Sequence, residues 1–417
     1  QETEMLAQAL TVNPRIGIAA IFRNEFPYIV EWLAHHRVLG IDAFFIADND
    51  SDDGSTELLA ALNSLGYLEH LPFPTQDNTP PQMPAYATLM QAFAPRVDWM
   101  AFIDADEFLM PTGRESIKGI LSDVERISDA GALAVNWAVY GSGGHVSQPA
   151  GLVVENFQRR AEKQLINNHH IKSIVRCAAF ESVDGNPHIF RLRDGWEYVH
   201  ADGTRLEHHP ERGRGLSRTI CWERLRLNHY VVKSRQEFDR RKSPKGSATR
   251  LDRNKGDGYF QHHDRNEVLE AVDPAHLDAV RKETARILET LVSHGHVVVE
   301  RTSALARRTM LFKGIRGHVD KIEWSDDSLK VKGWALCGDG QTPDCLEVML
   351  GEQLVTDIRL TRFARPDVQR HYPSANLMSG FQIEAALSGL AGQTTHLQVL
   401  AGESAGTPRT ALAMPQA

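Results

Sequence analysis

The stretch WMAFIDADEF, residues 99–108, decides the fold class of this chain. Its first half is short, apolar and rich in bulky side chains, which predicts a fully buried strand. Such strands belong to parallel sheets covered on both faces, and ligands gather beyond the carboxyl ends of those strands. Asp104 and Asp106 follow the strand directly. Two carboxylates this close repel each other, so the pair predicts a compensating cation or strong hydrogen-bond donors. A hard divalent ion that also binds phosphate oxygens is the simplest answer.

A second acid cluster lies upstream. Residues 15–22 and 43–47 are apolar runs that predict two more strands, with a helix between them that ends near Gly40. The second run is followed by DNDSDDGS, residues 48–55. Alternating strands and helices of this length predict an α/β fold with a mixed, mainly parallel sheet and flanking helices. The two acid clusters would then face one crevice at the carboxyl edge of the sheet.

The composition narrows the function classes. The chain has 417 residues, enough for two or three domains, and a net charge of −8, which argues against wholesale binding of nucleic acid. No apolar run approaches the ~20 residues that a transmembrane helix needs, so no transmembrane segment is predicted and peripheral membrane association stays open. The 4 cysteines lack the spacing of a metal or redox motif. We therefore expect free thiols and a cytoplasmic location.

The pattern changes after residue 264. Residues 1–264 carry the alternating α/β pattern, whereas residues 265–317 have helical spacing of apolar side chains and predict a helical linker, with Asp273 capping a helix. From residue 318 to 417, short strand-like runs are separated by turn residues at the spacing of a small β-sandwich domain.

Several motifs together carry a family resemblance. They occur in order along residues 15–247: residues 18–55, containing EWLAHHRVLG and DNDSDDGS, then DADEF at 104–108, NW at 136–137, GSGGH at 141–145, KSIVR at 172–176 and LNHY at 227–230. The chain resembles the glycosyltransferase family 2-like superfamily of GT-A (Rossmann-like) fold, and more narrowly its DxDEF and NHY branch. The GWAL and RPDV segments at 333–336 and 365–368 resemble a β-module appended to bacterial glycan-building proteins.

The resemblance implies a metal-dependent, inverting glycosyltransferase. Such an enzyme moves a sugar from a nucleotide-diphosphate donor, here expected to be a UDP-sugar, to a hydroxyl of a glycan or glycolipid acceptor. The expected setting is bacterial surface polysaccharide synthesis.

The resemblance also assigns the metal ligands. Asp104 and Asp106 are the DxD acids, and His229 of the NHY motif is the third expected ligand, although a histidine packed between strands is an equal alternative. Carboxylates with an imidazole suit Mn²⁺, and Mg²⁺ is the alternative.

Donor binding involves further residues. The predicted donor-binding residues are Asp48, Asp104, Lys233 and Lys242. Asp48 matches the family position that contacts the base or ribose, and Lys242 begins a basic Gly/Ser/Pro-rich segment that is either a clamp on the diphosphate or a solvated surface.

The acceptor side is less defined. An inverting enzyme needs a general base, for which Glu155 is the first candidate and Asp184 and His188 are competitors. The predicted acceptor-pocket residues are Trp137, Gly143 and His145.

Two other interpretations remain open. Similar sheets with paired acids also serve nucleotidyltransferases and nucleotide-sugar hydrolases. Alternatively, the chain is a non-catalytic glycan-binding protein that acts through its C-terminal β-module.

Overall fold

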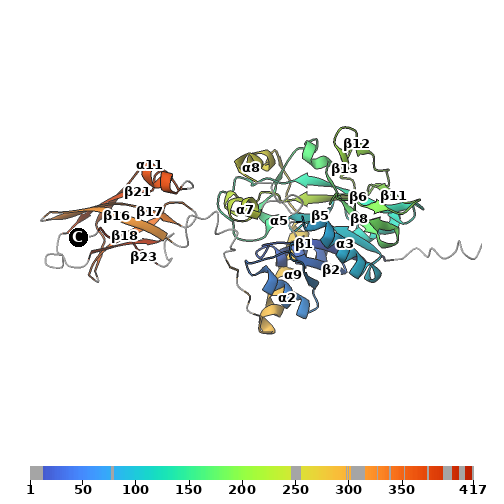
Figure 1. The fold of residues 1–417 in the computed structure, drawn as a ribbon, viewed down its shortest axis with the longest axis horizontal. Helices are drawn as coiled ribbons and strands as arrows, with labels where there is room; N and C mark the ends of the chain where they lie inside the picture. The colour runs from blue at the N-terminus through green and yellow to red at the C-terminus, as the bar shows by residue number, and fades with distance from the viewer. Residues whose placement is uncertain are drawn as a thin grey trace, which may run out of the picture. The chain divides into compact units, whose positions relative to one another are not determined.

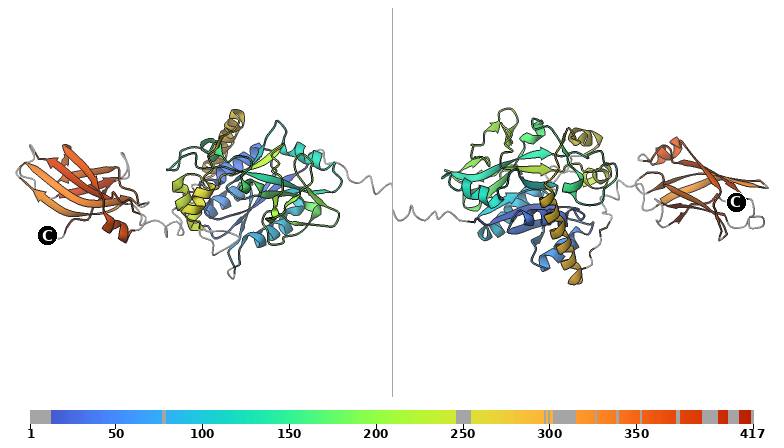
Figure 2. Two further views of the ribbon diagram at one scale, coloured as in Figure 1. Left: turned by 90° about the horizontal axis from the view of Figure 1, so that it is seen from above. Right: turned by 180° about the vertical axis from the view of Figure 1, so that it is seen from behind.

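The fold was taken from a computed structural model (Figures 1 and 2). The structure describes residues 13–76, 79–245, 255–296, 298, 300–301, 315–325, 327–337, 340–351, 353–372, 375–387, 397–402 and 409–415. The chain divides into two compact units, Gln1–Ala304 and Leu305–Ala417. Each unit is described by itself.

The first unit is built on a nine-stranded mixed sheet. Its order is β3 (Glu69–Pro72), β2 (Ala43–Asp48), β1 (Ile16–Phe22), β4 (Trp99–Phe102), β8 (Ile171–Arg176), β6 (Ala130–Val139), β14 (Leu225–His229) and β5 (Glu107–Pro111), with β11 (Glu197–Val199) paired to β6. Strands β3, β2, β1 and β4 are parallel to one another. Strand β8 is antiparallel to its two neighbours, β4 and β6. Both β14 and β11 run parallel to β6, and β5 is antiparallel to β14. The predicted mixed, mainly parallel α/β sheet is confirmed.

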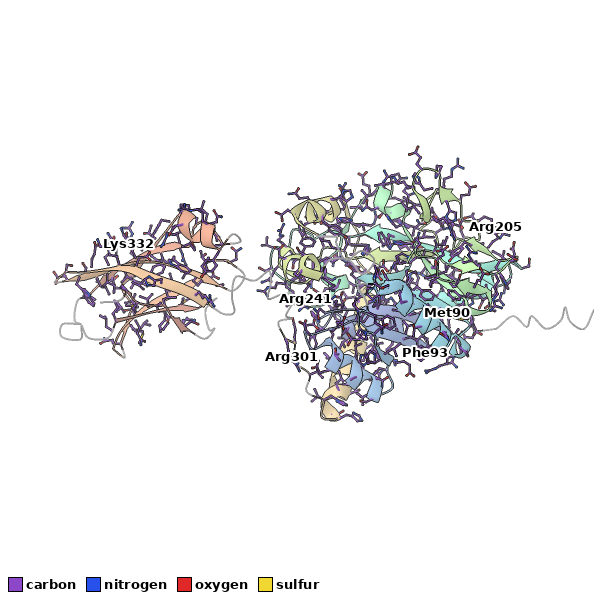
Figure 3. All side chains as sticks on the ribbon, in the orientation of Figure 1. Met90, Phe93, Arg205, Arg241, Arg301 and Lys332 are labelled. Atoms are coloured by element: carbon purple, nitrogen blue, oxygen red, sulfur yellow. The ribbon has the colours of Figure 1, made fainter. Side chains whose placement is uncertain are left out.

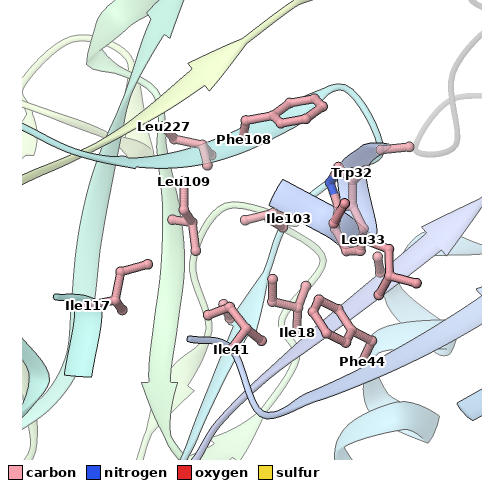
Figure 4. Packing of buried hydrophobic residues seen from close by; sticks show 14 of the residues in the cluster. Ile18, Trp32, Leu33, Ile41, Phe44, Ile103, Phe108, Leu109, Ile117 and Leu227 are labelled. Atoms are coloured by element: carbon pink, nitrogen blue, oxygen red, sulfur yellow. The ribbon is translucent and has the colours of Figure 1, made fainter. Parts of the chain in front are cut away.

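Helices cover both faces of this sheet. One hydrophobic cluster (Figure 4) joins side chains of the sheet to α1 (Ile29–Val38), α2 (Ser55–Ser64), α4 (Ile117–Val124) and α9 (Pro274–Ser293). A separate cluster joins the sheet to α3 (Gln82–Phe93), on which Figure 3 labels Met90 and Phe93. Strand β4 alternates between the two clusters: Trp99 belongs to the first and Phe102 to the second. This two-sided burial is what an uninterrupted apolar strand requires.

Helix α9 lies within residues 265–317, the predicted helical linker. Asp273 caps it by accepting a hydrogen bond from the backbone N–H of Ala275 at 2.9 Å, as predicted. Its side chains contact α1, where Glu283 forms an ion pair with Arg37 at 2.7 Å. The helix is therefore part of the first unit. Residues 302–314 lie outside the described residues.

Shorter elements complete the first unit. They are α5 (Val153–Asn156), β7 (Arg159–Arg160), β9 (Phe180–Ser182), β10 (Arg191–Leu192), β12 (His208–His209), β13 (Gly213–Ser217), α6 (Arg235–Glu237), the π-helical segment η4 (Phe238–Lys242), α7 (Ser243–Lys245), α8 (Asp257–His263), β15 (Val268–Leu269), and the 3₁₀ turns η1 (Ala94–Arg96), η2 (Ile166–His169) and η3 (Cys177–Ala179).

The second unit is a small β-sandwich. One sheet has the order β16 (Ile315–Trp324), β17 (Ser328–Cys337), β21 (Gly380–Ala386), β20 (Ile358–Phe363), and the other β19 (Gln353–Val355), β18 (Cys345–Leu350), β22 (Leu397–Gly402), β23 (Thr410–Ala411). A short helix, α11 (Pro366–His371), follows β20. One core contains Val331 and Phe381 from the first sheet and Val348 and Val399 from the second. The predicted β-sandwich is confirmed.

Two sequence expectations about the chain as a whole can be compared with the structure. All four cysteines are free thiols. Among the helices that the structure describes, none combines the length and the apolar character needed to cross a bilayer.

Candidate active site

The two acid clusters lie at one edge of the sheet. Asp48 ends β2, and Asp106 follows β4 after a short turn. Strand β1 pairs in parallel with both strands, so the two carboxyl ends point the same way with one strand between them. Neighbouring strands are ~4.8 Å apart, so β2 and β4 lie about 10 Å from each other across the sheet. Acids from both clusters therefore lie at the same edge of the sheet.

Asp106 is buried between a histidine and a lysine. Its Oδ1 lies 3.6 Å from Nε2 of His229, and its Oδ2 forms an ion pair with Nζ of Lys242. Burial by itself raises the pKa of Asp106, but the positive charge of Lys242 and the contact with His229 outweigh burial and hold this pKa well below its ordinary value. The carboxylate is therefore charged and already in contact with a cation.

His229 reaches Asp106 because of the sheet topology. Strand β14 pairs with β5, and His229 lies directly opposite Glu107, the residue after Asp106. The His229 ring is buried, and burial lowers its pKa. Among the residues that the structure describes, no group hydrogen-bonds its Nδ1. A neutral imidazole beside a carboxylate provides the mixed nitrogen and oxygen set that Mn²⁺ binds.

Asp104 has a different environment. Its Oδ2 accepts a hydrogen bond from Nζ of Lys172 at 2.9 Å, and its Oδ1 accepts from Gln82 at 2.9 Å and from Tyr86 at 3.2 Å. Burial raises the pKa of Asp104, but Lys172 outweighs burial and the net shift is downward. Both oxygens are thus held by protein donors.

Glu107 shares the lysine of Asp104. Nζ of Lys172 lies 3.3 Å from Oε2 of Glu107, which also accepts the backbone N–H of Asp104 at 2.7 Å. Glu107 is fully buried, and burial raises its pKa to about 8. Burial lowers the pKa of Lys172, but Asp104 and Glu107 outweigh it and hold that pKa well above its ordinary value. We call residues 104–107 the acid loop, and Lys172 is its internal counter-ion.

Asp48 is held from two sides. Its Oδ2 accepts a hydrogen bond from the Thr56 hydroxyl and lies 3.5 Å from Nε2 of His70. Burial raises the pKa of Asp48, but the hydrogen bonds with His70, Ser51 and Thr56 outweigh burial and lower it. Its Oδ1 is buried and has no hydrogen-bond partner within the described ranges of the chain. The oxygen is therefore an unused acceptor at the sheet edge.

Several lysines surround these acids. Lys233 is buried, and its Nζ lies 4.2 Å from the ring centroid of Tyr28. Among the described residues its Nζ has no ion-pair or hydrogen-bond partner, and burial lowers its pKa. Burial also lowers the pKa of Lys255 to about 7, and Lys242 and Asp106 are among the charges that act on it. Lys245 pairs with Glu25, and residues 246–254 of the basic segment lie outside the described residues.

Trp137 lies at the centre of a group of imidazoles. Its ring centroid is 4.3 Å from that of His229, 4.6 Å from His170 and 5.3 Å from His188. Nδ1 of His188 bonds the carbonyl oxygen of Ile171 at 2.8 Å, so Nδ1 carries the proton and Nε2 the lone pair. Burial lowers the pKa of His188 to about 3, and Lys172 and Asp104 are among the charges that act on it. Trp137 and His188 are therefore next to the acid loop.

The other two candidate bases are engaged in ion pairs. Glu155 on α5 pairs with Arg281 of α9, and Asp184 pairs with Arg214. Both pairs are partly exposed, and neither partner belongs to the acid loop. The structure therefore packs His188 against Trp137 and places Glu155 and Asp184 in contact with arginines.

The predicted acceptor loop is anchored by its backbone. Gly143 has a φ of +62°, which suits glycine, and its N–H donates to Oδ1 of Asn266 at 2.7 Å. The ring of His145 packs against Phe157 at 5.6 Å. These contacts explain the shape of the loop and assign it no chemical role.

The predicted metal ligands are only partly gathered. Asp106 faces His229, whereas Asp104 is turned to Lys172. In the described part of the chain, the three potential ligand atoms that lie within 4.8 Å of one another belong instead to Asp202, Cys221 and Glu223. Asp202 and Glu223 are exposed, and their carboxylates already accept hydrogen bonds from Thr204 and Trp222. We therefore do not assign a metal to Asp202, Cys221 and Glu223.

Three contributors to the site were missed from the sequence. They are Trp32, Glu107 as a buried acid, and Lys255. Lys172 was not missed: facing phosphate or pairing with acids were its two expected roles, since a lysine inside the apolar run IKSIVR must find a counter-charge, and it pairs with Asp104 and Glu107. The role of Trp32 depends on a contact across 72 residues of sequence and had no such signal.

With this geometry established, the chain was compared with known proteins. Residues 18–210 match the family description glycosyltransferase family 92. A glycosyltransferase family 92 protein of Oryza sativa subsp. japonica is 28% identical over 195 residues, which cover 46% of this chain and 32% of that protein. One of Ricinus communis is 28% identical over 188 residues, with 44% and 33% covered. The chain thus spans about a third of the length of these relatives, and the match supports a glycosyltransferase enzyme.

Solved structures were compared as well. A crystal structure of S. aureus TarS has 10% sequence identity and a TM-score of 0.30, covering 96% of this chain and 77% of that chain. A structure of TarS residues 1–349 in complex with UDP has 14% identity and a TM-score of 0.26, covering 40% and 47%.

Proposed function

We propose that this chain is a glycosyltransferase that moves a sugar from a nucleotide-diphosphate donor, with a UDP-sugar as the first candidate, to a hydroxyl of a glycan acceptor. The match of residues 18–210 to family 92 supports glycosyl transfer in general. The finer proposal depends on one observation: Asp106 and His229 face each other at the sheet edge. Lys233, which has no ion-pair partner in the described part of the chain, is among the charges acting on that carboxylate.

The donor set suits a divalent ion. Two ligands of an octahedral ion with ~2.1 Å bonds lie about 3 Å apart. The 3.6 Å between Oδ1 of Asp106 and Nε2 of His229 is close to that separation. We propose these two residues as protein ligands of Mn²⁺ or Mg²⁺. Asp104, which Lys172 orients, would instead contact the nucleotide-sugar donor. When bound, such an ion offsets negative charge that develops on the departing diphosphate.

The chain's own lysines would bind that diphosphate. A buried ammonium without an anionic partner is costly, and a phosphate oxygen would relieve that cost. Lys233 has no ion-pair partner among the described residues, and Lys242 contacts the Asp106 carboxylate. Together they provide a fixed positive surface for a group with two or three negative charges.

The acceptor hydroxyl needs a proton acceptor. His188 offers the lone pair of Nε2, because the Ile171 carbonyl fixes the proton on Nδ1. Trp137 packs against the same imidazole and offers an aromatic face of the kind that sugars contact. We propose that Nε2 of His188 accepts a hydrogen bond from the acceptor hydroxyl and orients it. Burial lowers the pKa of His188 to about 3, which makes it a weak base, so Glu155 and Asp184 stay candidates for the general base.

The test is donor binding followed by product analysis on the full chain. A thermal-shift screen of UDP- and GDP-sugars, with Mn²⁺, Mg²⁺ or EDTA, should show stabilisation by one donor only when a divalent ion is present. Turnover should release nucleoside diphosphate in step with glycosylated acceptor. Free sugar without acceptor would instead show hydrolysis, and pyrophosphate would show nucleotidyl transfer. Either result would overturn the proposal.

A further inference from the structure

Helix α1 carries an unusual number of buried polar side chains. Glu31, His35 and His36 are almost or fully inaccessible, as is Trp32 with its single N–H donor. Buried polar groups are costly unless they are hydrogen-bonded, so their partners show what they stabilise. In α1, the partners are backbone groups of other segments or of α1 itself, apart from the contact of His35 Nδ1 with Nε2 of His276 at 3.1 Å.

Trp32 bonds the acid loop on both sides of Asp106. Its indole N–H lies 2.9 Å from the carbonyl oxygen of Glu107 and 3.2 Å from that of Asp104. One donor thus draws two carbonyl groups together across the turn. The turn is closed by a hydrogen bond from the N–H of Glu107 to the carbonyl of Asp104 at 3.1 Å.

The two histidines bond the strand that follows. Nε2 of His35 lies 2.8 Å from the carbonyl oxygen of Leu109, and the N–H of Leu109 donates to Nε2 of His36 at 3.2 Å. Nδ1 of His36 donates to the carbonyl of Trp32 at 2.8 Å, which leaves Nε2 free to accept. Because β5 is the last strand in the sheet order, it has a free edge, and α1 replaces the missing neighbour there.

We propose that Trp32 is a positioning residue for Asp106, and that His35 and His36 extend the same support along β5. By fixing the peptide groups before and after Asp106, the indole N–H fixes the direction in which that carboxylate points toward His229. Trp32 touches no reacting group itself. The effect on activity rests on the proposed function, whereas the effect on the loop does not.

The experiment compares two tryptophans. Trp32→Phe keeps an aromatic ring against Phe22, whose centroid is 5.2 Å away, but removes the N–H. Trp99→Phe is the matched control, because Trp99 is equally buried and its N–H donates to Glu125 at 2.8 Å, away from the acid loop. Each protein is examined by hydrogen exchange of the 104–109 peptide, by Mn²⁺ titration calorimetry and by steady-state kinetics.

We expect Trp32→Phe to raise amide exchange in residues 104–109 at least tenfold and to weaken Mn²⁺ binding about tenfold. The kcat should fall with the acceptor KM unchanged, and Trp99→Phe should change none of these. Equal behaviour of the two variants, or unchanged exchange in Trp32→Phe, would overturn the positioning role. The wild-type protein itself could fail to bind Mn²⁺ and fail to turn over. If Trp32→Phe still exchanged faster than that wild-type protein, the positioning role would stand and the proposed function would be refuted. If Trp32→Phe fails to fold, His36→Leu removes the bond to Leu109 and should raise exchange in the same peptide.

Discussion

The ammonium of Lys242 forms an ion pair with Oδ2 of Asp106, across 136 residues of sequence. The contact joins the π-helical segment η4 to the loop after β4. It compensates the charge of a carboxylate that is almost buried, and breaking one partner of such a pair is costly. Because of this ion pair, a divalent ion that binds Asp106 would compete with the ammonium of Lys242 or lie beside it.

The first prediction concerns Asp106. Asp106→Asn should weaken Mn²⁺ binding at least tenfold and reduce Mn²⁺-dependent turnover about 10³-fold, because one of two proposed protein ligands loses its charge. Calorimetry and initial rates measure both effects. Asp202→Asn is the control, since Asp202 belongs to the exposed acidic group elsewhere. Turnover of Asp106→Asn at the wild-type rate would refute the metal assignment.

Lys242 should have two opposing effects. In Lys242→Met, Mn²⁺ without donor should bind about fivefold more tightly, because an ion pair of roughly 1 kcal/mol no longer competes. The donor KM should rise about tenfold, because a cation near the diphosphate is lost. Lys282→Met, on the exposed side of α9, should change neither value. Weaker Mn²⁺ binding in Lys242→Met would show that the ammonium does not compete.

Lys233 provides a test that separates binding from stability. Lys233→Met keeps the alkyl chain against Tyr28 but removes a buried charge that has no ion-pair partner among the described residues. We expect the free energy of unfolding to rise by about 1 kcal/mol, while the affinity for a nucleoside diphosphate falls about tenfold. Chemical denaturation and calorimetry measure the two quantities. A loss of stability with unchanged affinity would make Lys233 a structural residue.

The three candidate bases can be ranked by kinetics. His188→Gln should lower kcat by about 10²-fold with little change in the donor KM, because the hydrogen bond that orients the acceptor hydroxyl is lost. Glu155→Gln and Asp184→Asn should each lower kcat less than about threefold, because their carboxylates are paired with Arg281 and Arg214. A larger loss in Glu155→Gln than in His188→Gln would restore Glu155 as the first candidate.

The histidines of α1 should make stability depend on pH. Burial lowers the pKa of His36 to about 3, below an unfolded value of about 6.5. The neutral ring is therefore favoured in the folded state, and stability that is complete above pH 6.5 is lost as the pH falls. One such histidine reduces the free energy of unfolding by about 2 kcal/mol at pH 5. Urea unfolding followed by tryptophan fluorescence measures this loss, and His36→Gln, which retains a donor and an acceptor, should reduce the slope.

Much of the fold could be predicted from local patterns. The apolar run at residues 99–103 predicts a strand buried on both faces, and β4 does contribute to two hydrophobic clusters. The turn-separated runs after residue 318 predict a sandwich, because period-two burial and turn residues are local signals. The acids at the strand ends were located for the same reason, since the end of a strand is visible in the sequence.

The partners of those acids were decided by tertiary structure alone. Nothing near Asp104 or Asp106 in sequence indicates that Lys172 will hold one and Lys242 the other, because ion pairs depend on distance in space. The same holds for Trp32, whose role as a donor to the acid loop arises only when α1 packs against β5. The chain sequence by itself determined which elements form and where polar side chains end them. Packing then determined which charges meet, because a buried charge is stabilised only by a neighbour of opposite charge that the fold brings into contact with it.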